Sequence, residues 1–559
     1  MMSWVCADVV ARLSSGVGVI MEQRKRWQHK HVPVAILTIS LLTVAAGSQA
    51  LSFQFGEDRE WELDWDTNVA YTAQMRVAKR DNNQFRYRDT GDVTADSTAW
   101  AVLINANDGD NNFDRGDLVQ NKVSAVTEID LSWRNLGLFA RARTYYDEVY
   151  DQDTELSQQN YLTYNNNTKF PNGDAYFRQF PEGTVDEHRD RLEMLDYFLY
   201  ASGEAFGDHL YSIRLGSQVI NWGEATFTQG ISGLQNRADL IARNTPGVEV
   251  KEILLPTGAI YGQIDLTMDL TFEAYYQYEW KKTELNGVGS YFSDRDFLGP
   301  GARNFLIPIG SNPDSITAVP RTADDSASAS GQWGAALHWI VLGDTDIGLY
   351  YINAHSKAPA YQINYPTNGS PLPESYTIVY FEDIQGYAAS FTTVLGITNV
   401  QGEVSFKTGM PVVLENGDPV EGDLLSYQIG GSYVFEPNAL WDDANLTFEL
   451  AGAYLTSHDS GELLYDDNGT VVNLRLELAY LNLLPGLDLK VPIFFRRGMD
   501  GNILESEMVE DSSAVNVEFQ FVYLNNFTTK IGYSNFFDGG ENTYINDRDN
   551  ISLSISYSF

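Results

Sequence analysis

The stretch Ile551-Ser552-Leu553-Ser554-Ile555-Ser556-Tyr557-Ser558-Phe559 decides the fold class. Apolar or aromatic side chains occupy every odd position of this stretch, and serine occupies every even position. A period of two predicts a β-strand with one apolar and one polar face. The strand ends on an aromatic residue that carries the terminal carboxylate. This favours the closing strand of a membrane barrel over a strand of a soluble sandwich.

Alternating segments of this kind recur along the whole chain, as transmembrane β-barrels require. The first of them is unusually long, and we expect the apolar face of Trp65–Val77 to contact lipid while Asp64 and Asp66 face the lumen. The predicted strands are 61–77, 122–134, 137–149, 191–203, 210–220, 257–267, 268–281, 331–341, 345–355, 384–394, 397–409, 424–436, 443–457, 470–481, 486–497, 513–524, 526–537 and 549–559.

The connections between these segments alternate between short and long. Tight turns such as Arg134–Gly137 and Tyr523–Phe527 are separated by long polar stretches. Short periplasmic turns and long extracellular loops are typical of outer-membrane barrels. We therefore predict an all-β fold, a transmembrane antiparallel up-and-down β-barrel of about 18 strands (16–20), with both termini in the periplasm. The loops expected to be extracellular or folded into the lumen are 78–121, 150–190, 221–256, 282–330 and 356–383.

Residues 1–50 have the features of a signal peptide. Basic residues within 24–30 precede an apolar run from Val32 to Ala46, and the small residues Ser48 and Ala50 follow. The run is shorter than the roughly 20 apolar residues that a helical span needs, so cleavage after Ala50 is favoured over a membrane anchor. Met21 is an alternative start. The single cysteine leaves with this segment, and residues 51–559 are expected to form one outer-membrane barrel domain of a Gram-negative envelope.

The charge of the chain excludes one class of partner. The formal net charge is −39, and residues 1–50 carry +3, which leaves about −42 for the rest. Nucleic-acid binding depends on Lys and Arg at phosphate, so such binding is not expected. The expected surroundings are outer-membrane lipid and lipopolysaccharide. The C-terminal strand resembles the signal that the outer-membrane barrel assembly machinery reads, which makes that machinery an expected partner.

Charged residues recur on the polar faces of the predicted strands, where they would line the lumen. Arg141 and Arg143, for example, alternate with Ala140 and Ala142. One interpretation is a selectivity ladder for a charged solute, and the other is cross-lumen ion pairing that rigidifies the wall. The sequence favours neither. The candidate lumen residues are Arg141, Arg143, Arg214, Glu273, Arg475 and Arg496.

The third long loop, 221–256, holds more apolar side chains than a water-exposed loop would. We expect them to be buried in the lumen or at the rim and to form an apolar constriction. The alternative is that they pack only on other loops. The candidate constriction residues are Trp222, Phe227, Ile231, Leu234, Leu240 and Ile241.

The acidic motif Asp108, Asp110, Asn112, Asp114 and Asp117 offers the oxygen ligands that calcium prefers. Phe113 occupies the position where an EF-hand loop needs glycine, so a solvated acidic loop is the favoured interpretation and a structural calcium ion is the alternative. No other cofactor is expected. The histidines after residue 50 show no spacing typical of a nucleophile or a metal site, and we expect no enzymatic activity.

Four motifs resemble the domain-of-unknown-function family 1302. They are Asn112–Asn121 (NFDRGDLVQN), Leu215–Phe227 (LGSQVINWGEATF), Gln277–Thr283 (QYEWKKT) and Tyr291–Ala302 (YFSDRDFLGPGA). The resemblance covers essentially all of residues 51–559. It implies a proteobacterial outer-membrane protein linked to hydrophobic compounds or lipids, with a periplasmic partner from family 1329. The resemblance brings no catalytic or binding residues with it.

Three functions from different classes follow. The leading hypothesis is a channel that takes up hydrophobic or lipid-like compounds, which rests on the resemblance and on the apolar third loop. The second is a water-filled diffusion porin for small polar solutes, since barrels of 16 to 18 strands can leave an aqueous channel. The third is the outer-membrane component of a lipid-export or assembly apparatus. Only Leu51 to about Glu60 precede the first predicted strand, so any plug must come from the loops.

Overall fold

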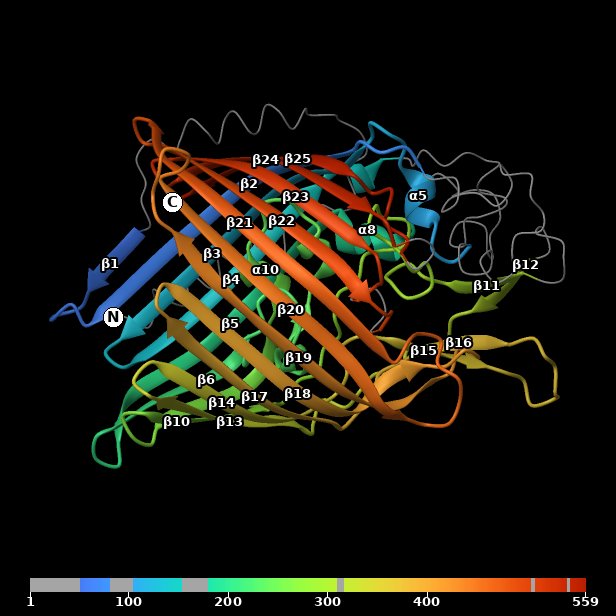
Figure 1. Cartoon of the computed structure of the whole chain (residues 1–559), viewed down its shortest axis with the longest axis horizontal. Coiled ribbons are helices and arrows are strands. Elements are labelled where there is room, and N and C mark those ends of the chain that lie inside the picture. The colour runs from blue at the N-terminus through green and yellow to red at the C-terminus, as the bar shows by residue number, and fades with distance from the viewer. Residues whose placement is uncertain (1–50, 81–103, 153–178, 309–315, 504–507, 540–542) are drawn as a thin grey trace, which may run out of the picture. The chain divides into compact units, whose positions relative to one another are not determined.

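The computed structural model describes residues 51–80, 104–152, 179–308, 316–503, 508–539 and 543–559 (Figure 1). They belong to the compact unit Ala50–Phe559, and the predicted signal peptide lies outside the described residues. None of the helices in these described ranges is long and apolar enough to cross a membrane.

The main sheet has 19 strands, and all of them except β1 form a closed antiparallel ring of 18 in which β25 pairs back with β2. The ring consists of β2 (Trp61–Arg76), β3 (Leu118–Trp133), β4 (Leu136–Asp147), β5 (Asp190–Ala205), β6 (His209–Gln218), β9 (Thr257–Asp265), β10 (Leu270–Gln277), β13 (Gln332–Val341), β14 (Thr345–Ala354), β17 (Ile384–Leu395), β18 (Thr398–Val413), β19 (Pro419–Phe435), β20 (Asp443–His458), β21 (Asn468–Leu484), β22 (Leu487–Asp500), β23 (Ser513–Tyr523), β24 (Phe527–Phe537) and β25 (Asn550–Ser558).

The predicted barrel and its strand number are confirmed, and each predicted strand corresponds to one strand of the ring. The larger differences lie at the hairpin between β18 and β19. There the pairing continues to Val413 and Pro419, beyond the predicted limits at 409 and 424. A register shift between Lys407 and Met410 interrupts the alternation in this hairpin, which hides the continuing strand from a period-two pattern.

The strand β1 (Leu51–Phe55) was not predicted. It pairs with Trp61–Trp65 of β2, on the same edge of β2 that pairs with β25 from Asn68 onward. β1 therefore occupies the edge of β2 beyond the point where its pairing with β25 ends. In Figure 1, β1 projects from the ring.

The strand register places alternate residues of every strand on an inward face that continues around the whole ring. Residues that pair across strands point to the same side of a sheet. The inward face of β2 includes Thr72, which pairs with Ser554, and Arg76, which pairs with Asn550. Asp64 and Asp66 share this face, as predicted. The outward face is apolar, with side chains such as Phe519 about 45% exposed, and this is the surface that a lipid-contacting wall needs.

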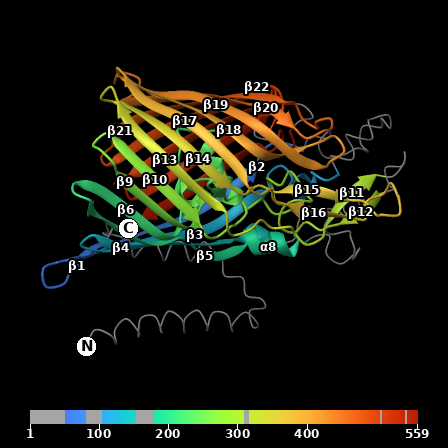
Figure 2. The ribbon, with the colours of Figure 1, turned by 90° about the horizontal axis from the view of Figure 1, so that it is seen from below.

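The two ends of the barrel differ. Tight turns close one end, which we call the turn end, and the long connections leave from the other, the loop end. At the loop end lie α5 (Asp108–Asn112), η2 (Glu148–Asp151), α8 (Glu182–His188) and the hairpins β11 (Asn304–Pro308)–β12 (Ile316–Pro320) and β15 (Ala360–Asn364)–β16 (Ser375–Val379). Figures 1 and 2 both show the two hairpins beyond the same end of the ring. They share an apolar cluster that includes Phe297, Val319 and Tyr376.

Candidate functional site in the lumen

The connection between β6 and β9 folds into the barrel. It contains η3 (Ile231–Leu234), β7 (Arg237–Ala238), α9 (Leu240–Arg243), α10 (Val250–Ile253) and β8 (Leu254–Leu255). We call residues 222–256 the plug. Its ribbon lies inside the ring in both Figure 1 and Figure 2.

Apolar side chains of the plug pack against the inward face of the wall. Trp222 and Ile231 are buried in one cluster with the inward residues Tyr275, Tyr350 and Ile352. The Trp222 ring lies 5.0 Å from that of Tyr275. Of the other candidate constriction residues, Leu234 and Ile241 are buried and Leu240 is half-buried. The ring of Phe227 packs against that of Phe494 of β22, with the ring centroids 5.4 Å apart.

Two carboxylates on the inward wall hold the first part of the plug through its backbone. Glu449 of β20 accepts hydrogen bonds from the N–H groups of Thr226 (2.8 Å), Phe227 (3.0 Å) and Thr228 (2.9 Å). Glu403 of β18 accepts from the N–H groups of Glu224 (3.0 Å) and Ile231 (2.6 Å). A buried backbone amide needs a partner, and a carboxylate makes a stronger hydrogen bond than a neutral acceptor.

Two lysines bind carbonyl groups of the same part. Lys407 Nζ of β18 donates to Gly230 O (3.0 Å), and Lys357 Nζ donates to Leu234 O (2.9 Å) and to Gln332 Oε1 (3.2 Å). Burial lowers the pKa of Lys357 to about 7, because desolvation disfavours the ammonium form.

The sequence interpretation missed Glu403, Lys407 and Lys357 as site residues. For the first two a signal was present: they alternate with apolar residues in the predicted strand 397–409, as the candidate lumen residues do. Lys357 follows β14 in a connection, where no periodic pattern singles it out.

The second part of the plug contacts the opposite wall. Arg143 Nη2 of β4 donates to Asp239 (2.6 Å) and its Nη1 donates to Glu252 O (3.2 Å). Gln120 of β3 donates to Thr245 Oγ1 (2.9 Å). In the ring of 18, β3 and β18 are nine strands apart. The plug therefore spans the lumen and is bonded to the wall on both sides.

The structure places all six candidate lumen residues on the inward face. Arg141 forms ion pairs with Glu128 (3.1 Å) and Asp196 (2.7 Å), and Arg143 pairs with Glu193 and Asp239. These contacts tie neighbouring strands to each other and to the plug. For the two β4 arginines they favour the ion-pairing interpretation over the selectivity ladder.

The remaining candidates differ among themselves. Glu273 accepts hydrogen bonds from Trp222 Nε1 (2.7 Å) and the Tyr261 hydroxyl (2.9 Å), so it helps to hold the plug against the wall. Arg475 pairs with Glu477, and Arg496 lies opposite Asn473 in the register. Arg214 stacks over the ring of Tyr261 at 4.4 Å. A role for any of them in selectivity stays a prediction.

The acidic motif does not converge on one point. Asp108, Asp110 and Asn112 are buried in α5, whereas Asp114 is exposed and pairs with Arg80, and Asp117 accepts the Asp114 N–H. Within the described ranges, no group of three or more His, Cys, Asp or Glu is placed to hold a metal ion.

Asp110 contacts cations from the protein itself. It pairs with Arg76 (2.5 Å) and Arg548 (3.1 Å), and burial raises its pKa to about 6. These two arginines supply positive charge at Asp110 from within the chain. A structural calcium ion stays a prediction.

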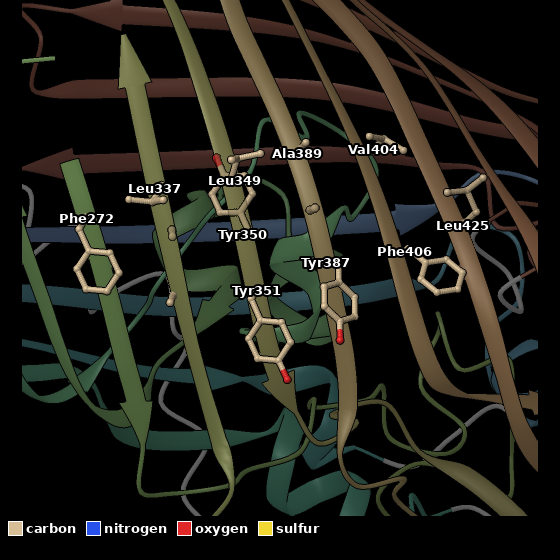
Figure 3. A pocket seen from close by; sticks show the side chains of 13 residues that line it. Phe272, Leu337, Leu349, Tyr350, Tyr351, Tyr387, Ala389, Val404, Phe406 and Leu425 are labelled. Atoms are coloured by element: carbon tan, nitrogen blue, oxygen red, sulfur yellow. The ribbon is translucent and has the colours of Figure 1, made fainter. Parts of the chain in front are cut away.

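An apolar hollow of about 510 Å³ lies on the lipid-facing wall over β10 to β19 (Figure 3). The rings of Phe272, Tyr351, Tyr387 and Phe406 line it (Figure 3). The small residue Ala389 leaves space between these rings. The strands behind the hollow are continuously paired, so the hollow by itself opens no path to the lumen.

The closed ring, the apolar outer face and the charged lumen define a transmembrane β-barrel of the outer-membrane, porin-like class. The chain belongs to the family described as "Protein of unknown function (DUF1302)", whose family model matches residues 32–559. The predicted membership is confirmed.

Comparison with solved structures finds barrels of low similarity. Acinetobacter baumannii OccAB3 is 11% identical over 89% of this chain and 99% of its own, with a TM-score of 0.41. OccAB1 of the same organism is 9% identical over 92% and 99%, with a TM-score of 0.43. A BenF-like porin from Pseudomonas fluorescens Pf-5 is 9% identical over 89% and 98%, with a TM-score of 0.41. Comparison with curated proteins finds no match.

Proposed function

We propose that this protein is an outer-membrane channel that takes up hydrophobic or lipid-like compounds. The observation that carries the proposal is the plug, which spans the lumen and is bonded to opposite walls. Trp222, Ile231 and Leu234 give it an apolar surface toward the wall. The apolar hollow on the outer wall offers an apolar solute a place to bind at the lipid-facing surface.

The loop end would face the exterior and the turn end the periplasm, as in barrels with long outer loops. The plug must then move, at least in part, for a solute to pass. Its polar anchors allow this, because hydrogen bonds to a few lumen residues can be exchanged for bonds to water. We further propose outer-membrane lipid, lipopolysaccharide, the barrel assembly machinery and a periplasmic family-1329 protein as partners.

Single-channel conductance of the purified barrel in a planar bilayer tests the role of the plug. We expect a silent barrel for the wild type and frequent openings for the Glu403→Gln/Glu449→Gln double variant. Each glutamine loses charge-assisted hydrogen bonds worth about 1.5–3 kcal/mol. The control is Glu477→Gln, because Glu477 faces the same lumen and pairs with Arg475 without touching the plug.

Uptake of radiolabelled hexadecane by cells that express the protein tests the solute class. We expect faster uptake with the wild type than with an empty vector, and faster still with the double variant. A steady ohmic conductance of the wild-type barrel, together with no gain in hexadecane uptake, would contradict the proposal.

The alternative, a diffusion porin for small polar solutes, is favoured by one observation, the mixed-sign charge of the inward wall. Arg475, Glu477 and the β4 arginines all face the lumen. Under this alternative the wild type conducts steadily, and liposomes that contain it swell in small sugars. A third candidate, an outer-membrane component of a lipid-export apparatus, has no specific observation in its favour.

A further inference from the structure

A second hollow, of about 420 Å³, lies inside the barrel between the plug and strands β4 to β6. A volume of this size is within the usual range of ligand pockets, about 300–1,000 Å³. The wall contributes Phe139, Phe198 and Arg214, and the plug contributes Val250, Lys251 and Leu254.

The hollow lies beside the second part of the plug and extends toward the turn end. On β4, Arg141 donates to the carbonyl of Lys251 (3.3 Å) and Arg143 to that of Glu252 (3.2 Å), so the plug rests at this height. Phe139 precedes Arg141 by two residues and is therefore closer to the tight turn between β3 and β4.

One side of the hollow is an aromatic shelf. The rings of Phe139 and Phe198 are stacked, with centroids 5.4 Å apart and planes 29° apart. Val250 of α10, about 68% exposed, and the half-buried Leu254 face the same space from the plug. Apolar groups exposed in a hollow of this kind are stabilised when an apolar body covers them.

Two of the cations that line the hollow already have carboxylate partners. Arg141 is paired with Glu128 and Asp196, and Lys251 Nζ is paired with Glu128 (2.7 Å) and Glu249 (3.1 Å). Asp196 already accepts from Arg141 and from the Val219 N–H (3.3 Å).

Arg214 differs from these cations. Its guanidinium lies over the rings of Tyr261 (4.4 Å) and Phe198 (5.7 Å). Over the ranges that the structure describes, no carboxylate lies within ion-pair distance of it. The nearby Glu273 instead accepts from the Tyr261 hydroxyl and from Trp222. The hollow thus combines an apolar shelf with one cation that the protein does not pair.

We propose that this hollow binds an amphipathic organic carboxylate, with its headgroup on Arg214 and its apolar body on Phe139 and Phe198. A guanidinium binds a carboxylate through two parallel N–H donors, which a neutral headgroup cannot match. A small polar carboxylate would leave the shelf uncovered. The inference rests on the proposed function, and it names the substrate class that the same lumen would carry.

Calorimetric titration of the refolded full barrel in dodecyl maltoside tests the proposal, with octanoate as the probe. We expect Arg214→Gln to weaken octanoate binding at least tenfold and Phe198→Ala to weaken it severalfold. Arg214→Lys, which keeps the charge but loses the planar fork, should recover part of the affinity. The matched control is Arg475→Gln, since Arg475 is a lumen arginine far from the hollow. Heat-modifiable migration in gels confirms that each variant is folded.

Two neutral or polar probes define the ligand class. The affinity for 1-octanol should be low and equal in the wild type and Arg214→Gln, and succinate should bind much more weakly than octanoate. Equal octanoate affinities in the wild type and Arg214→Gln would overturn the proposal, as would an equal loss in Arg475→Gln. Succinate binding as tight as that of octanoate would overturn the amphipathic class.

The hexadecane assay separates this inference from the proposed function. Hexadecane uptake without Arg214-dependent octanoate binding leaves the uptake function standing and removes the site. Arg214-dependent octanoate binding without hexadecane uptake supports the site and removes the wider hydrophobic function.

Discussion

Individual charged residues in the lumen act mainly as partners for the backbone. Glu449 accepts three consecutive N–H groups of the plug, and Glu403 accepts two more. Lys407 and Lys357 serve the carbonyl groups in the same stretch. A segment without regular secondary structure can cross the interior of a barrel only if its polar groups are satisfied in this way. These individual side chains therefore determine whether the plug stays in place.

Lys357 is expected to make the free energy of unfolding depend on pH. Its pKa in the folded protein is about 7, against roughly 10.4 in an unfolded chain. Between pH 7 and about 10 the unfolded state binds more protons, so the free energy of unfolding rises with pH in this window. Relative to Lys357→Met, we expect the wild type to gain up to about 1.4 kcal/mol per pH unit there.

Guanidinium unfolding at several pH values, followed by tryptophan fluorescence, measures this difference. Below pH 7 the lysine is protonated in both states, so the two curves should run parallel. Parallel curves across the whole range up to pH 10 would show that Lys357 is not desolvated in the folded protein.

At the scale of elements, the short helix η3 is seated on the inward face of β17. Gly386 provides the seat, because a Cβ atom there would lie 2.6 Å from Leu234 Cδ1 and 2.8 Å from Ile231 Cδ1. The neighbouring inward residues Ile352 and Ile384 belong to the same buried cluster. A side chain at residue 386 and a docked η3 therefore compete for the same space.

We expect Gly386→Phe to displace η3 and to raise the open probability of the barrel in planar bilayers. Overpacking costs about 1–3 kcal/mol, which is enough to change the ratio of docked to undocked plug about tenfold. Gly262→Phe is a control for folding, because Gly262 of β9 is on the lipid-facing side and a Cβ there meets nothing within 4 Å. Unchanged gating in Gly386→Phe would place the gate elsewhere than at η3.

At the scale of the whole molecule, ring closure sets two different environments on the two faces of every strand. In β23, Phe519 faces outward and is about 45% exposed, whereas Gln520 faces the lumen and donates to Glu518. Adjacent residues of one strand are thus subject to opposite requirements. Lipid excludes charge, and the lumen accepts it.

This arrangement predicts opposite outcomes for one substitution made at neighbouring positions. Phe519→Arg should lower the free energy of unfolding from lipid vesicles by about 2–4 kcal/mol, the cost of an arginine near the bilayer midplane. Gln520→Arg should change it by less than about 0.5 kcal/mol, since Glu518 can pair with the new cation. Equal effects at the two positions would contradict the assignment of the faces.

The barrel, its strand number and the alternation of strand faces could all be predicted from the amino-acid sequence. These features follow from a period-two pattern that is local, since a strand must present alternate side chains to lipid and to the lumen wherever it sits in the ring. The apolar content of residues 221–256 likewise predicted that this loop is buried. The sequence interpretation missed β1, whose five residues are too few for the pattern to stand out.

The role of each lumen residue depends on which groups the folded barrel brings together, so it could not be predicted from the sequence. Glu403 and Arg475 both stand at polar positions of their strands, yet one binds the plug and the other an adjacent glutamate. Closure of the ring brings β18 and β20 to the backbone of a loop that lies some 170 to 220 residues earlier in the chain. Such contacts leave no periodic trace in the sequence, because the partner is a backbone group that every residue carries. Among the described residues, the same closure brings aromatic rings and no carboxylate within reach of Arg214, and the proposed binding site rests on this arrangement.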